Sequence, residues 1–219
     1  MTEGSPMKLI LGFSVPLLFG YLFQQLYNLV DTMIVGQFLG VDALAAVGAT
    51  GSINFLIIGF CNGVCSGFAL PIAHRFGAKD YKTLRKLYAN SIWLSAIFAV
   101  IMTILTVAFC RPILTLMRTP ENIFEYSYQY IVIIFIGIPA TYLFNLTSGM
   151  IRALGNSRAP LIVLIVSSVL NVVLDLVFIL NFHMGVTGAA AATVLSQVIS
   201  GIACVIYIRK KVDMLQLSR

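Results

Sequence analysis

Residues 16–40, PLLFGYLFQQLYNLVDTMIVGQFLG, form an apolar run that is interrupted by a few polar side chains. These are Gln24, Tyr27, Asn28 and Asp31, and their spacings of three and four residues place them on one face of a helix. An aspartate inside a membrane helix costs roughly 2.5 to 3.5 kcal/mol on insertion scales. The stretch therefore predicts a membrane-spanning helix whose polar face needs a structural or functional reason.

The composition assigns the whole chain to the membrane. Hydrophobic residues make up 59%, charged residues only 10%, and the mean hydropathy is +0.97. Soluble domains carry about 25% charge, so this is predicted to be an integral membrane protein with lipid around it. The net charge of +6 comes from basic residues between the apolar runs. That pattern is typical of the positive-inside rule and not of nucleic-acid binding, so we expect no nucleic-acid partner.

Six apolar stretches reach the length of about 20 residues that crosses a bilayer. They are residues 9–36, 46–72, 88–109, 126–149, 160–180 and 188–208. Basic residues cluster in alternate loops, which predicts that both termini are cytoplasmic. We therefore expect an all-α integral membrane protein, with residues 1–219 forming a single six-helix transmembrane lobe in the cell membrane.

Small residues and prolines suggest how these spans pack. Gly59, Gly63 and Gly67 repeat every four residues, a ridge that lets another helix approach closely and predicts helix packing. Pro16 and Pro139 lie inside spans, where a proline removes a backbone hydrogen bond and can kink the helix. Three tyrosines near the outer end of the 126–149 span suit an aromatic belt: Tyr126, Tyr128 and Tyr130.

Two further spans carry polar faces like that of the first. The 160–180 span has Ser168, Asn171 and Asp175, and the 188–208 span has Thr193, Ser196, Gln197 and Ser200. Under the predicted topology Asp31, Asp175 and Thr193 each lie about five residues from the outer end, so all three sit roughly 7 Å below that boundary. Groups at one depth can share a proton or cation site. Such polar residues can instead form hydrogen bonds that hold neighbouring helices together.

The sequence contains little that indicates an enzyme. The sequence has no G-x-S-x-G, no P-loop and no H-E-x-x-H, and both aspartates lack the flanking glycine of intramembrane aspartyl proteases. Cys61 and Cys65 share a helix face, but no histidine or acidic residue is spaced to complete a metal site. We therefore expect no enzyme, no catalytic residue, no metal beyond sodium and no cofactor other than Na⁺ or H⁺ as a coupling ion.

In several stretches the chain resembles the amino-terminal half of a multidrug and toxic compound extrusion (MATE) transporter. These stretches are residues 16–40, ALAAVG at 43–48, AHRFGA at 73–78, RALGN at 152–156 with Pro160, and NVVLD at 171–175. The resemblance implies twelve helices in two six-helix bundles, which export organic cations and other amphipathic drugs against proton or sodium entry. It also implies a second lobe in cis, or a homodimer partner, because only half of that architecture is present.

The resemblance also assigns roles to individual residues. A proton or cation site is implied at Asp31, Asp175, Asn171, Tyr27 and Thr193. Pro16 matches the proline that is implicated in bending the first helix, and we interpret it as a hinge. The remaining polar residues on these faces are candidates to line the drug-binding lumen: Gln24, Asn28, Ser168 and Gln197.

The leading hypothesis is thus one lobe of a cation-coupled efflux antiporter for small amphipathic or cationic substrates. Two alternatives are a lipid-linked saccharide flippase of the same superfamily and a non-transporting membrane scaffold. Flippase lumens are usually lined by arginine and lysine, and the six spans as bounded above contain neither residue. Coupling by proton or by sodium stays open, since carboxylate, amide and hydroxyl oxygens suit either.

Overall fold

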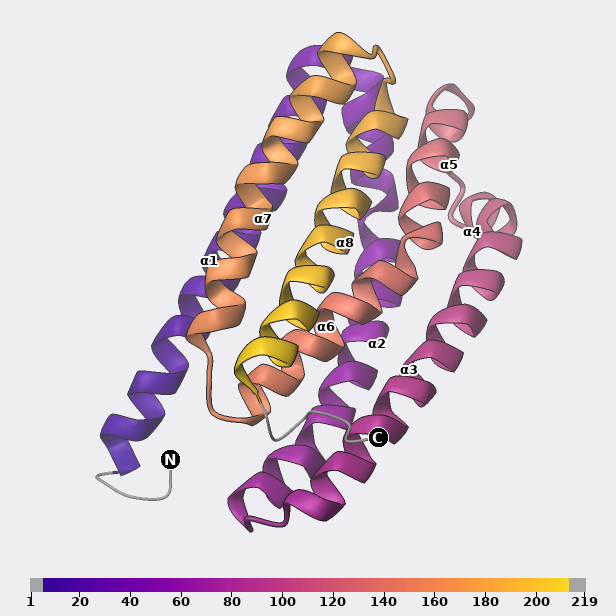
Figure 1. Cartoon of the computed structure of the whole chain (residues 1–219). Helices are drawn as coiled ribbons and strands as arrows, with labels where there is room; N and C mark the ends of the chain where they lie inside the picture. The colour runs from indigo at the N-terminus through magenta and orange to yellow at the C-terminus, as the bar shows by residue number, and fades with distance from the viewer. Residues whose placement is uncertain (1–5, 213–219) are drawn as a thin grey trace.

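The computed structural model describes residues 6–212, and their secondary structure is helical and arranged in one bundle (Figure 1). In chain order the helices are α1 (Pro6–Leu39), α2 (Val41–Gly77), α3 (Tyr81–Ala108), α4 (Cys110–Leu116), α5 (Glu121–Ile136), α6 (Ile138–Ala153), α7 (Arg158–Leu176) and α8 (Val186–Lys211). A π-helical turn, η1 (Val177–Asn181), extends α7. The predicted all-α class is confirmed.

Five of these helices are long and apolar enough to cross a membrane by themselves, and α5 with α6 would make a sixth span. The two halves of that span are bent by 46° at a break, where sequence analysis predicted one span over residues 126–149. Gly137 separates the halves, and Pro139 occupies the first turn of α6. A proline has no N–H to continue the α5 hydrogen-bond ladder, which explains a bend at this position.

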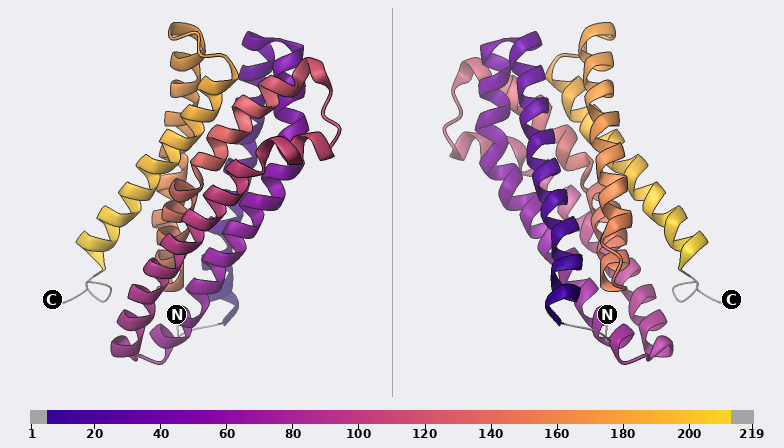
Figure 2. Two further views of the ribbon diagram at one scale, coloured as in Figure 1. Left: turned by 90° about the vertical axis from the view of Figure 1, so that its right-hand side faces the viewer. Right: turned by 90° about the vertical axis from the view of Figure 1, so that its left-hand side faces the viewer.

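The helices lie side by side, and the helix ends alternate between the two ends of the bundle (Figures 1 and 2). Pro6, Lys211 and the connections at residues 78–80 and 154–157 lie at one end, which we call the basic end. It carries the basic residues Lys8, Arg75, Lys79, Lys82, Arg85, Lys86, Arg158, Arg209, Lys210 and Lys211. Helix α8 packs against α5, α6 and α7, and α1 packs on α7 and α2.

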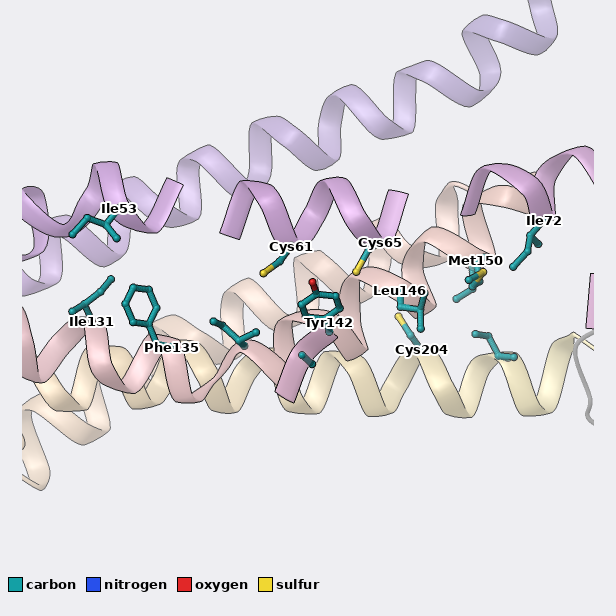
Figure 3. Packing of buried hydrophobic residues seen from close by; sticks show 14 of the residues in the cluster. Ile53, Cys61, Cys65, Ile72, Ile131, Phe135, Tyr142, Leu146, Met150 and Cys204 are labelled. Carbon is teal, nitrogen blue, oxygen red and sulfur yellow. The ribbon is translucent and has the colours of Figure 1, made fainter. Parts of the chain in front are cut away.

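The core lies between α2, α6 and α8 (Figure 3). All four cysteines are buried; Cys61 and Cys65 of α2 lie near Tyr142 of α6 in this core (Figure 3). Cys61 and Cys65 are four residues apart on α2 and turn toward the core, in which α2 packs on α6. Cysteine thus takes the packing role on this helix.

The prediction that Gly59, Gly63 and Gly67 form a packing ridge is not met within the described lobe. A Cβ added at any of the three would find no described atom within 4 Å. The glycines that do allow close packing are Gly137 and Gly201, whose added Cβ atoms would collide with side chains of neighbouring helices. A glycine at every fourth position allows another helix to pack closely, but it does not determine that a helix lies there. In this lobe a different face of α2 packs against the core.

Candidate functional site

Three helices meet at the hydroxyl of Thr193 on α8. Tyr27 Oη of α1 donates to Thr193 Oγ1 at 3.2 Å, and Asn171 Nδ2 of α7 donates to the same oxygen at 3.4 Å. The three side chains come from positions 27, 171 and 193, so a single acceptor joins segments far apart in sequence. The structure therefore brings together three of the residues that sequence analysis assigned to one site.

Two carboxyl groups lie next to this junction. Asp31 is 7% exposed and Asp175 is 0% exposed, and the two carboxyl groups are near enough for each to act electrostatically on the other. Asp31 Oδ1, Asn171 Oδ1 and both carboxylate oxygens of Asp175 are buried, and no described residue donates a hydrogen bond to them. Two adjacent buried carboxylates without donors are strongly destabilising unless a proton or a cation compensates them. The pair therefore has the geometry of an ion-binding site.

The local sequence explains how these groups are positioned. Asn171 and Asp175 are four residues apart on α7, and both are fully buried on the same face. On α1 the buried positions are Asp31, Ile34 and Val35, again at helical spacing. Immediately beyond Asp175, α7 widens into the π-helical turn η1, a feature that recurs at functional sites. Nothing in the sequence indicates that turn.

Tyr130 of α5 belongs to the same site, although sequence analysis placed it in an aromatic belt. It is 6% exposed and interacts electrostatically with Asp31, Asp175 and Tyr27, whereas Tyr126 is 47% exposed. The buried face of α5 includes Ser127, Tyr130, Ile131 and Ile134. That periodicity of three and four is readable in the sequence and could have assigned Tyr130 to the interior.

A cavity of ≈ 490 Å³ lies between α1 and α2 and reaches Asp31. Gln24 and Asn28, two predicted lumen residues, line it together with Asn54 and Asn62 of α2. The amide oxygens of both α2 asparagines are buried without a described donor. Sequence analysis missed this polar face of α2. Its signal was the spacing, in multiples of four, of the polar residues Thr50, Asn54 and Asn62.

The other two predicted lumen residues make hydrogen bonds to helices. Gln197 Oε1 accepts a hydrogen bond from Thr141 Oγ1 at 2.6 Å, which ties α8 to α6. Ser168 Oγ donates to Leu164 O in its own helix at 2.9 Å. Gln197 therefore makes the interhelical contact that sequence analysis had weighed against lumen lining, whereas the bond of Ser168 stays within α7.

Oxygen is the ligand type that the site offers. Carboxylate, amide and hydroxyl oxygens from Asp31, Asp175, Asn171 and Thr193 suit a hard monovalent cation or a proton, and do not suit a thiophilic metal. Among residues 6–212 no group of three or more His, Cys, Asp or Glu is arranged to hold a metal ion. The chemistry of the donor set therefore fits Na⁺ or H⁺.

Known proteins share both the sequence and the fold of this chain. "Probable multidrug resistance protein YoeA" of Bacillus subtilis is 35% identical over 211 residues, which cover 94% of this chain and 46% of that protein. "Multidrug export protein MepA" of Staphylococcus haemolyticus is 27% identical over 95% of this chain and 46% of its own length. The chain thus spans about half the length of the curated relatives it matches.

A similar solved structure is described as "Outward-facing conformation of a multidrug resistance MATE family transporter of the MOP superfamily". It superposes with a TM-score of 0.90 at 30% identity, covering 98% of this chain and 48% of that one. Another, "Crystal structure of MATE in the bent conformation", also gives a TM-score of 0.90. These relatives are transporters and not enzymes. The MatE family model matches residues 16–177, so the chain belongs to the MatE family.

Proposed function

We propose that this chain is one lobe of a cation-coupled multidrug and organic-cation efflux antiporter in the cell membrane, with both termini cytoplasmic. The single observation that carries the proposal is the buried carboxyl pair Asp31–Asp175, whose oxygens receive no donor from the described residues. Tyr27, Asn171 and Thr193 complete the site through the shared hydroxyl. A second six-helix lobe in the same chain, or a homodimer partner, would complete the transporter, in keeping with relatives of about twice this length.

The coupling ion acts through charge compensation. A proton or Na⁺ bound between Asp31 and Asp175 removes the repulsion between the two carboxylates and lets α1 pack closely on α7. When the ion leaves, the repulsion returns and α1 separates from α7 at this depth. Pro16 interrupts the hydrogen-bond ladder of α1 about four turns away, so it is the position at which α1 can bend in response.

The energetics of such coupling are sufficient for export. One positive charge that enters across 100 mV supplies about 2.3 kcal/mol, which corresponds to roughly a 50-fold concentration gradient. The substrate would occupy the cavity between α1 and α2, where amide oxygens of Asn54 and Asn62 stand beside the apolar side chains Phe55 and Ile58. Amide acceptors on an apolar wall suit small amphipathic cations. The flippase and scaffold alternatives are not favoured, because the named relatives are multidrug resistance and export proteins.

The test is dye export by full-length protein in inside-out vesicles under an imposed proton or sodium gradient. Asp31→Asn should abolish gradient-driven export, because an amide cannot exchange a proton or balance a cation. Asp42→Asn, a carboxylate at the end of the bundle opposite the basic end, is the matched control and should export normally. Undiminished export by a folded Asp31→Asn protein would overturn the proposal.

The same variants identify the ion. If Na⁺ binds, the melting temperature of the purified wild-type protein should rise with NaCl but not with choline chloride, and the Asp175→Asn variant should lose that rise. If the ion is a proton, NaCl and choline chloride should act alike, and dye binding should release protons from the wild-type protein only.

A further inference from the structure

A second cavity, of ≈ 120 Å³, lies toward the basic end between α1, α2, α6 and α7. Its volume equals that of about four water molecules, enough for a small charged group. Its lining mixes apolar side chains, among them Pro16, Leu161 and Leu164, with polar ones. The polar side chains that line it are Tyr21, Gln24, Asn62, Ser66, Asn145, Ser148, Arg152 and Ser157.

Arg152 is the charged residue of this cavity. It lies in the last turn of α6 and lines the cavity. Its Nη2 donates to Ser148 Oγ at 3.3 Å. No carboxylate in the described part of the chain lies within ion-pair distance of the guanidinium. The cavity therefore holds a cation without an anionic partner from residues 6–212.

The surroundings reinforce the positive potential of this cavity. An adjoining cavity shares Ser157 and is lined by Lys8 and Arg158, so two more cations lie in the neighbouring space. Asp80 is the described carboxylate at the basic end, and it is paired with Arg75 at 3.5 Å. Clefts lined by one sign of charge raise the local concentration of the opposite ion. Anions are therefore concentrated at the mouth of the cavity that contains Arg152.

We propose that this cavity binds a phosphate-type anionic group on Arg152. The planar guanidinium matches a phosphate oxygen pair, and the serine and amide side chains around it can donate to the remaining oxygens. The orphaned Asn62 Oδ1 can accept a hydrogen bond from a hydroxyl on the same ligand. The group has two sources, the phosphodiester headgroup of a membrane lipid or a free phosphate in solution.

The test uses delipidated full-length protein in neutral detergent. It is titrated separately with short-chain phosphatidylglycerol, short-chain phosphatidylcholine and inorganic phosphate, and binding is followed by thermal shift and by native mass spectrometry. Binding of phosphatidylglycerol alone, or more tightly than phosphatidylcholine, identifies an anionic lipid headgroup, and binding of inorganic phosphate identifies a free anion. No binding of any probe at millimolar concentration would overturn the proposal.

Variants localise the binding. Arg152→Gln should weaken it about 10- to 100-fold, the equivalent of one charge-assisted hydrogen bond. Arg75→Gln removes the same charge from an exposed residue at the same end and should leave the affinity within about threefold, which is the scatter expected for a distant surface charge. Equal affinity in the wild-type protein and in Arg152→Gln would refute the assignment.

A second variant keeps Arg152 and fills the space. A Cβ at Gly20 would lie 3.7 Å from Leu161 Cδ1 and 3.8 Å from Leu164 Cδ2, ordinary contact distances, so a side chain can be accommodated there. Gly20→Leu should block ligand entry while the charge is unchanged. If Arg152→Gln does not fold, loss of binding in Gly20→Leu supports the proposal, and full binding contradicts it.

Discussion

Replacing Gly137 by alanine places a methyl group between the two halves of the bent span and the neighbouring helix α8. The added Cβ would overlap Val194 Cγ2, would lie 3.0 Å from Val194 Cγ1 and would lie 3.1 Å from Ile134 O. Gly137 has φ −76° and ψ −4°, a conformation that alanine adopts without strain. The substitution therefore tests side-chain packing and not backbone freedom.

The magnitude follows from the overlap. Carbon atoms pack best about 3.5 to 4.0 Å apart, so α8 or the α5–α6 break must move by roughly 1 Å to relieve the contact. Overpacking of this kind costs about 1 to 3 kcal/mol, equivalent to a decrease of roughly 2 to 12 °C in melting temperature for a chain of this size. Val194 adjoins Thr193, so the same movement would lengthen the hydrogen bonds of 3.2 and 3.4 Å that meet at its hydroxyl.

The assay is thermal unfolding of the purified protein, followed by the fluorescence of Trp93, the single tryptophan. Gly137→Ala should melt lower than wild type, and adding Val194→Ala should recover most of the loss because it removes the colliding methyl groups. The double-mutant cycle should give a coupling energy of at least about 1 kcal/mol. Additive effects of the two substitutions, or a wild-type melting temperature for Gly137→Ala, would refute this account of the bend.

Three further sets of substitutions test the packing, the junction and a helix cap. Gly63→Ala should leave the melting temperature unchanged or raise it, because its Cβ meets open space, whereas Gly201→Ala should lower it through a contact of 2.8 Å. Thr193→Val should destabilise by roughly 0.6 kcal/mol for each hydrogen bond lost, and Thr193→Ser should not, as measured by thermal unfolding. Hydrogen bonding from Thr83 holds the pKa of the Asp80 carboxyl below its usual range. The ionised carboxylate therefore stabilises the folded protein at neutral pH, and this contribution is lost as the pH falls through the lowered pKa. Thermal melting of Asp80→Ala should therefore differ from wild type at pH 7 and converge with it in acid.

The groups at the site were predictable because they depend on quantities that the sequence fixes. Helical spacing puts Asn171 and Asp175 on one face, and the alternation of spans puts Asp31 and Thr193 at a similar depth. Residues that lie at the same membrane depth, on helix faces that point into the bundle, come close together once the helices pack. The structure joins Tyr27, Asn171 and Thr193, a combination that the family resemblance implied and that spacing and depth allow.

The remaining features depend on how each helix is rotated, which spacing alone does not determine. The glycine stripe of α2 and its cysteine stripe are both small and both repeat every four residues, and only the packed structure shows that Cys61 and Cys65 face the core. Tyr130 lies close to the expected interface depth, yet its helix turns it inward. Pro139 signals a kink, but the 46° bend also requires Gly137 to lie against α8.

The buried charged residues in the described part of this lobe do not form ion pairs with one another, although buried charges in a membrane bundle usually do. Buried ionic groups are usually paired with each other, because an unpaired charge in low dielectric is far more costly than an ion pair. Here the carboxyl pair of Asp31 and Asp175 and the guanidinium of Arg152 lie in one lobe, yet within residues 6–212 no ion pair joins them. A purely structural use of these residues would favour an internal salt bridge. Asp31 and Arg152 line different cavities, and the two proposals above compensate each charge with a ligand: a cation between Asp31 and Asp175, and an anion at Arg152.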